Sequence, residues 1–123
     1  MLLPSEIEAR VMLPLLRAAV VTLLIRDHGF QQRRVAKALG ITQPAVSNYM
    51  RMARGKMREL LENMTMQEVA GGIVDAILRG EDDMVVRELI QKGLERLRRE
   101  RILCVAHKTL EPVLDVNTCH ICD

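Results

Sequence analysis

The sequence predicts an all-α protein, and three observations support this prediction. Aromatic residues make up only 2% of the 123 residues, with no Trp, so the core must be built from aliphatic side chains. Such a composition disfavours a β-sandwich and an aromatic platform for single-stranded nucleic acid. Apolar residues recur at helical spacing. Glycines and capping patterns separate these runs. The length fits one or two small domains.

The first helix is expected close to the N-terminus. Ser5-Glu6-Ile7-Glu8 fits a capping box, in which the Ser5 hydroxyl and the Glu8 carboxylate bond free backbone amides. Apolar residues then continue at helical spacing to Leu23. We expect Pro14 to kink or split this helix, and His28-Gly29 to end it.

Two short helices are predicted next. The first runs from about Gln31 to Leu39 and ends at Gly40, and the second begins after Thr42 and breaks near Gly55.

Two longer helices follow. Thr65 to Glu68 is a second candidate capping box and opens a helix that Gly80 ends. Asp82 or Asp83 then begins a helix to about Leu103. The apolar stripe of this last helix consists of Val86, Leu89, Ile90, Leu94 and Leu97.

Residues 32–51 carry the pattern of a helix-turn-helix. Ala36 is small where a second helix would cross the first, and Gly40 permits the positive φ of a tight turn. Thr42 caps the second helix, and Pro44 is tolerated in its first turn. The residues expected to fill the wedge between the helices are Val35, Leu39, Ile41 and Val46. An ordinary helical hairpin is the alternative for such a pattern.

The start of the second helix carries the candidate base-reading residues. In this motif the first residues of the recognition helix meet base edges in the major groove. Gln43 can pair with adenine through two hydrogen bonds, and Ala45 can contact a thymine methyl. Ser47 and Asn48 are expected to reach a base or a phosphate. Gln32 is placed to bond a phosphate and to steady Gln43.

The charge distribution favours DNA binding over the hairpin alternative. Residues 26–58 contain eight cations and one anion, a net charge of +7, whereas the whole chain carries only +2. A basic block within an otherwise acidic chain is typical of a surface that binds a phosphate backbone, although a solvated helix surface is the alternative for charge alone. The candidate phosphate contacts are Arg33, Arg34, Lys37, Arg51, Arg54 and Lys56.

The segment resembles known DNA-binding regulators. The residues that carry the resemblance to the Cro/phage-repressor class of helix-turn-helix domains are Gln32, Ala36, Leu39-Gly40-Ile41, Gln43, Val46-Ser47 and Arg51. Leu3-Pro4, followed by a helix with Leu13-Pro14, is similar to a group of short archaeal predicted transcriptional regulators. In that group a repressor-like domain precedes a cysteine-containing tail. The resemblance implies a transcriptional regulator and leaves its target genes open.

The last twenty residues contain a candidate metal site. Cys104 and His107 are separated by two residues, as are Cys119 and Cys122. Three thiolates and one imidazole form a complete tetrahedral set for Zn²⁺, the metal that this ligand count favours. An iron–sulfur cluster is the second possibility, and three free cysteines are the third. His120 is expected to be a solvated residue. An odd number of cysteines favours a reducing, cytoplasmic compartment.

The expected layout is a helix-turn-helix DNA-binding domain over residues 1–62, a helical connector over 63–103 and a metal-binding tail over 104–123. We expect a homodimer on a double-stranded DNA operator, because one monomer reads only a short half-site. The helix 84–103 is the candidate interface, unless its stripe packs on the helix 65–79 of the same chain.

Other classes of function have less support. No apolar run is long enough to span a membrane. No glycine-rich phosphate loop, nucleophile elbow or catalytic carboxylate pair indicates an enzyme, and no small-molecule substrate is evident. The alternative function is a zinc-containing protein-interaction adaptor whose helical hairpin does not bind DNA.

Overall fold

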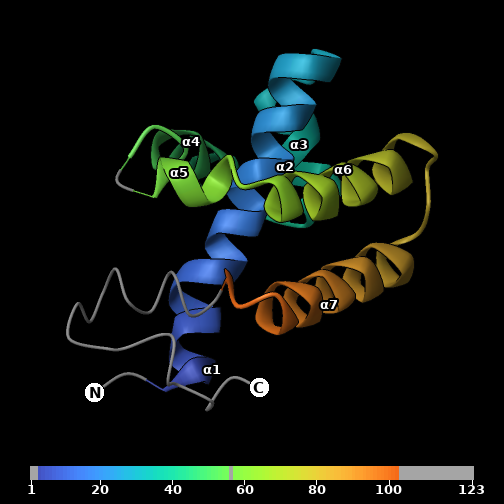
Figure 1. Cartoon of the computed structure of the whole chain (residues 1–123). Helices are drawn as coiled ribbons and strands as arrows, with labels where there is room; N and C mark the ends of the chain where they lie inside the picture. Colours follow the sequence, from blue (N-terminus) through green and yellow to red (C-terminus); the bar gives the residue numbers. More distant parts are fainter. Residues whose placement is uncertain (1–2, 56, 103–123) are drawn as a thin grey trace.

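The computed structural model describes residues 3–55 and 57–102, and these residues fold as helices joined by short turns (Figure 1). The elements are α1 (Pro4–Ile7), the π-helical segment η1 (Glu8–Met12), α2 (Leu13–His28), α3 (Gln32–Leu39), α4 (Gln43–Met52), α5 (Arg58–Leu61), α6 (Met64–Leu78) and α7 (Asp83–Arg99). The described part of the chain contains no strand, which confirms the predicted all-α class.

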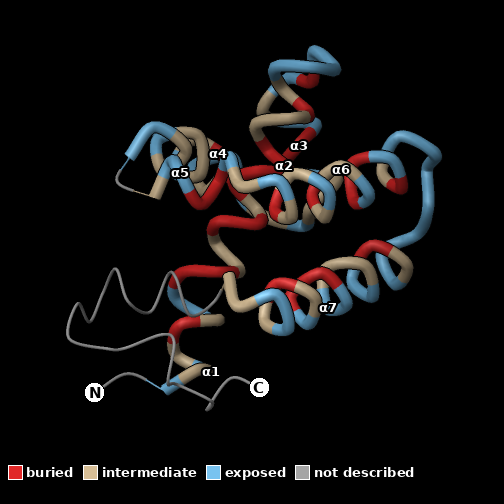
Figure 2. Tube along the Cα trace, in the orientation of Figure 1, coloured by how far each residue is buried: buried red, intermediate tan, exposed pale blue. Residues whose placement is uncertain are grey.

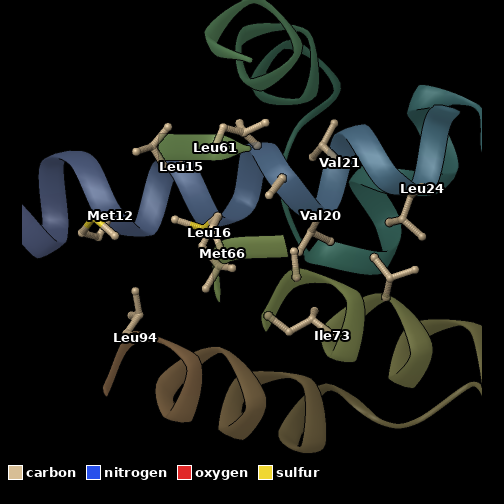
Figure 3. Packing of buried hydrophobic residues seen from close by; sticks show 14 of the residues in the cluster. Met12, Leu15, Leu16, Val20, Val21, Leu24, Leu61, Met66, Ile73 and Leu94 are labelled. Atoms are coloured by element: carbon tan, nitrogen blue, oxygen red, sulfur yellow. The ribbon is translucent and has the colours of Figure 1, made fainter. Parts of the chain in front are cut away.

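The central element is α2, around which the other helices pack (Figures 1 and 3). Its fully or almost fully buried residues are Leu15, Leu16, Ala18, Ala19, Val20, Val21 and Leu24. A helix that is apolar on most of its surface is stable only when neighbours cover it. Leu61, Met66, Ile73 and Leu94 supply part of that cover from α5, α6 and α7 (Figure 3).

The chain enters its first helix two residues earlier than the capping-box pattern predicts. Leu3 is the N-cap, Pro4 occupies the first helical position, and the Glu6 carboxylate accepts the Leu3 backbone N–H at 3.2 Å. Proline favours this position because its φ is already helical and its missing N–H would have no partner there. The predicted Ser5–Glu8 box is therefore wrong.

Pro14 changes the hydrogen-bonding pattern without interrupting the helical run. It lies in the first turn of α2, directly after the π-helical segment η1. There the Leu13 N–H donates to the Glu8 carbonyl, five residues earlier. The proline ring would clash with the carbonyl four residues before it, and a wider turn relieves that crowding. The expected split thus takes the form of a local π-bulge.

The capping residue of α6 is Asn63, which corrects the prediction of Thr65. The Asn63 side chain accepts the Met66 N–H at 3.2 Å, and α6 begins at Met64. Thr65 already lies inside the helix and donates instead to Glu100 at 3.1 Å. The predicted cap of α7 is confirmed, since Asp82 accepts the Val85 N–H at 3.0 Å.

The apolar stripe of α7 packs on α6 within the chain. Val86, Leu94 and Leu97 are buried, while the opposite face of α7 is exposed (Figure 2). The two helices approach so closely that a Cβ on Gly93 would lie 2.3 Å from Val69 Cγ1. The helix ends at Arg99, earlier than predicted, and Leu103 lies outside the described residues. The apolar stripe of α7 therefore packs within the chain, which is the alternative to its use as a dimer interface.

An ion-pair network joins the C-terminal end of α7 to the N-terminal part of α6. The Arg96 guanidinium contacts Glu68 Oε2 at 2.5 Å and Glu100 Oε2 at 2.7 Å. The hydrogen bond from Arg96 lowers the pKa of Glu100 below its usual value. All three side chains are partly exposed, so the network adds only modestly to the free energy of unfolding.

Candidate nucleic-acid interface

The turn between α3 and α4 has the geometry of a helix-turn-helix. Gly40 adopts φ +64° and ends α3, and the Ile41 N–H donates to the Ala36 carbonyl at 3.0 Å. Thr42 Oγ1 then accepts the Ala45 N–H at 3.2 Å and caps α4. The predicted end of α3, the glycine turn, the cap and the start of α4 are confirmed, while α4 ends at Met52, three residues before Gly55. Together they fix the direction in which α4 leaves α3.

Small and branched side chains fill the wedge between the two helices, as predicted. Val35 and Val46 are completely buried, and Ala36 is 8% exposed. Leu39 and Ile41 are half-buried at the edge of the same cluster. A larger side chain at position 36 would separate the helices, so these residues determine the spacing of the unit.

A polar contact links the two helices on the outer side of the wedge. The Ser47 hydroxyl donates to Gln32 Oε1 at 3.0 Å, and Gln32 Nε2 lies 3.5 Å from Met50 Sδ. The sequence predicts that Gln32 steadies Gln43, but its partner on α4 is Ser47. The contact orients α4 against α3 and leaves Gln43 exposed at the start of the recognition helix.

One face of α4 presents polar groups to solvent. Gln43, Asn48 and Arg51 are exposed, and the Arg51 guanidinium donates to Asn48 Oδ1. Ala45 and Ser47 are only half-buried. Of the four predicted base-reading residues, Gln43 and Asn48 therefore extend furthest into solvent. We call Gln43, Asn48 and Arg51 the α4 polar face.

The predicted phosphate contacts differ in their surroundings. Arg33, Arg51 and Arg54 are exposed, whereas Lys56 lies outside the described residues. Arg34 is exposed but lies over the Phe30 ring, 3.8 Å from its centre.

Arg34 and Lys37 also line a hollow of about 300 Å³, and Glu81 and Asp83 belong to the same lining. These two carboxylates reduce the positive potential beside them, and Arg54 likewise lies in a hollow with Asp27 and Glu62, so Arg33 and Arg51 are the better-placed cations.

Comparison with known protein families agrees with this geometry. Residues 12–103 match the ParB HTH domain, a stretch that covers most of the chain and includes α2 to α7. The chain belongs to the ParB HTH domain family. Members carry a helix-turn-helix DNA-binding domain, which is the motif class that the sequence predicts. No curated protein and no solved structure matches the chain.

Membership of the ParB HTH family bears on two of the sequence predictions, the class of the DNA-binding motif and the domain boundaries. The helix-turn-helix is confirmed, whereas the resemblance to the Cro/phage-repressor class stays a prediction. The match also runs through residue 62, the predicted domain boundary. The division into residues 1–62, 63–103 and 104–123 stays a prediction.

The hydrogen bond between α2 and α4 was not predicted from the sequence. Arg17, which is half-buried on α2, donates to the Tyr49 hydroxyl at 3.4 Å. Tyr49 belongs to the inner side of α4, so this contact lies behind the α4 polar face. No short sequence pattern pairs residues 32 positions apart, and only the crossing of the two helices brings them together.

The predicted metal ligands Cys104, His107, Cys119 and Cys122 lie outside the described residues. Among residues 3–55 and 57–102, no group of three His, Cys, Asp or Glu side chains is arranged to hold a metal ion. In the same ranges, no helix has the length and apolarity needed to cross a membrane.

Proposed function

We propose that this protein is a cytoplasmic transcriptional regulator that recognises a specific duplex DNA sequence through α4. The observation that carries the proposal is the α4 polar face. Gln43, Asn48 and Arg51 are exposed on a helix whose other side is buried and fastened to α2 and α3. Such an arrangement presents hydrogen-bonding groups to a major groove at low conformational cost.

The residues of the face have separate roles. Gln43 occupies the first helical position after the Thr42 cap, where its amide can pair with N6 and N7 of adenine. Asn48 Oδ1 accepts from Arg51, so its amide nitrogen is left to donate to a base or phosphate. Arg33 and Arg51 contact phosphates, which fixes the register without selecting sequence.

A homodimer on a two-fold operator follows from the same reasoning, because one helix reads too few bases for a unique site. The α7 stripe is used within the chain. The exposed large apolar side chains of the described residues are Leu3, Met64, Leu78 and Met84, and of these we favour Leu78 and Met84, which lie together near the α6–α7 turn, for a subunit contact. Sedimentation equilibrium of the free protein and of its DNA complex tests this stoichiometry.

Selection from a random pool of duplex DNA tests sequence recognition. Wild-type protein should enrich one motif, and Gln43→Ala should lose about 1–3 kcal/mol of specific affinity while non-specific binding stays nearly constant. Gln91→Ala is the matched control, because Gln91 is exposed on α7, away from the α4 polar face. An enriched motif that Gln43→Ala binds as tightly as wild type would overturn the assignment of α4 as the recognition helix.

We also propose that Cys104, His107, Cys119 and Cys122 bind one metal centre. Three thiolates and an imidazole suit Zn²⁺, which would stabilise the tail, and an iron–sulfur cluster would make it a redox or iron sensor. Zinc, iron and acid-labile sulfide per chain, measured on protein purified without oxygen, separate the two. One zinc without iron supports the structural role, iron with matching sulfide supports the sensor, and neither metal contradicts the proposal.

A further inference from the structure

A hollow of about 450 Å³ lies between α2, the last turn of α4 and α5. Its volume falls within the range of small-molecule binding pockets. Met50, on the inner side of α4, and Ala53, which directly follows α4, belong to its lining and pack on the core. The hollow is therefore separate from the α4 polar face.

The hollow combines apolar walls with a charged rim. The apolar lining residues are Ala19, Leu23, Ile25, Met50, Ala53 and Leu61. Arg26, Arg54 and Arg58 supply three cations at the rim, and Asp27 and Glu62 supply two carboxylates. The site thus has a net positive charge of one next to an apolar surface.

The three arginines differ in their existing partners. Arg58 Nε contacts Glu62 Oε1 at 3.0 Å, so this cation and this carboxylate neutralise each other. Within the residues that the structure describes, Arg26 and Arg54 form no ion pair. Two unpaired arginines therefore line the hollow, with Asp27 as the one unpaired carboxylate among its lining residues, and an anion is the complementary ligand.

Two other polar side chains of the hollow, Thr22 and Gln67, already donate to backbone carbonyls. The Thr22 hydroxyl donates to the Ala18 carbonyl at 2.7 Å, and the Gln67 amide donates to the Leu61 carbonyl at 2.7 Å. The Thr22 hydrogen is thus engaged, and one hydrogen of the Gln67 amide is left beside the five-donor guanidinium groups, so Arg26 and Arg54 are the main donors for a ligand.

From these observations we propose that the hollow binds an amphipathic organic anion, in which a phosphate or carboxylate meets Arg26 and Arg54 and a small apolar body covers Leu23 and Met50. Such a ligand would press against the last turn of α4. An effect on operator affinity rests on the proposed DNA-binding function, whereas binding of the anion does not.

Calorimetric titration with 1-naphthyl phosphate tests this site without DNA. One probe per chain should bind, and inorganic phosphate and 1-naphthol should each bind at least about tenfold more weakly, because each satisfies only half of the site. Arg26→Gln should weaken the probe at least about tenfold. Arg87→Gln, an exposed arginine on α7, is the matched control and should bind like wild type.

Three results would overturn the proposal: no heat of binding, equal affinity for 1-naphthol, or equal affinity of Arg26→Gln and Arg87→Gln for the probe. Displacement of the probe by unrelated duplex DNA, with Arg26→Gln weakening both ligands equally, would assign the hollow to a backbone phosphate instead. Gln43→Ala should bind the probe like wild type, so failure of base recognition and failure of this site are distinguishable.

Discussion

The core around α2 and the α3–α4 unit are built in different ways. Along α2, most residues from Leu15 to Leu24 are aliphatic and completely buried, and α5, α6 and α7 add to the same cluster. The α3–α4 unit contributes only Val35, Ala36 and Val46 to the buried set and keeps polar groups outside. Stability is therefore concentrated around α2, and recognition is concentrated on α4, so the two properties should respond to different substitutions.

The largest expected effect comes from the centre of the core. Leu16→Ala removes a completely buried side chain and should lower the free energy of unfolding by about 2–5 kcal/mol, as measured by denaturant titration. Where the variant is still folded, its DNA affinity should match that of wild type. A loss below about 1 kcal/mol would contradict the central role of α2.

The contact between α6 and α7 should give the next largest effect. Gly93→Ala places a Cβ 2.3 Å from Val69 Cγ1 and should destabilise by about 1–3 kcal/mol through overpacking. Adding Val69→Ala should recover part of this loss, because it removes the clashing methyl groups.

Gly72→Ala is the matched control for this substitution. Gly72 lies in α6, and a Cβ added there would meet no atom within 4 Å, so alanine should stabilise by roughly 0.5–1 kcal/mol. Equal stabilisation by Gly93→Ala and Gly72→Ala would contradict the close helix contact.

The sequence predicts the α3–α4 unit more accurately than the rest of the fold. Gly40, Thr42 and Pro44 determine that unit through local backbone geometry, which neighbouring residues alone reveal. The α6–α7 contact depends on how two helices meet, so neither the tight spacing at Gly93 nor the intrachain role of the α7 stripe follows from periodicity. The Ser47–Gln32 contact likewise depends on the crossing of α3 and α4.

The two capping errors have a common cause. Thr65 to Glu68 and Ser5 to Glu8 both satisfy the capping-box pattern, but Asn63 and Pro4 provide competing helix starts nearby. Several residues of one segment can each satisfy a local rule, and the local pattern alone does not choose among them.

A cap substitution tests this correction and should have a moderate effect. Asn63→Ala removes the acceptor of the Met66 N–H and should cost about 1 kcal/mol of unfolding free energy. Thr65→Ala is the control and should cost less, since it loses only an exposed hydrogen bond to Glu100. A greater loss in Thr65→Ala would restore Thr65 as the cap.

The smallest effect is expected at the edge of the core, where Glu100 accepts from Arg96. This hydrogen bond lowers the pKa of Glu100 in the folded state. Its contribution is therefore present above the unfolded pKa and is lost as pH falls through the folded pKa. Glu100→Gln should reduce stability slightly at pH 7 and not at strongly acidic pH. An equal difference at both values would show that the charge is irrelevant.

The salt dependence of DNA binding tests most directly whether the α3–α4 unit is a DNA-binding surface. Affinity for duplex DNA should fall steeply between about 50 and 200 mM salt as phosphate contacts are lost. Arg51→Gln should make the negative slope of log K against log salt shallower by about 1, because one phosphate contact is lost. Arg87→Gln on α7 should leave the slope unchanged. An absence of duplex binding at low salt would contradict this account and would favour a protein-interaction adaptor.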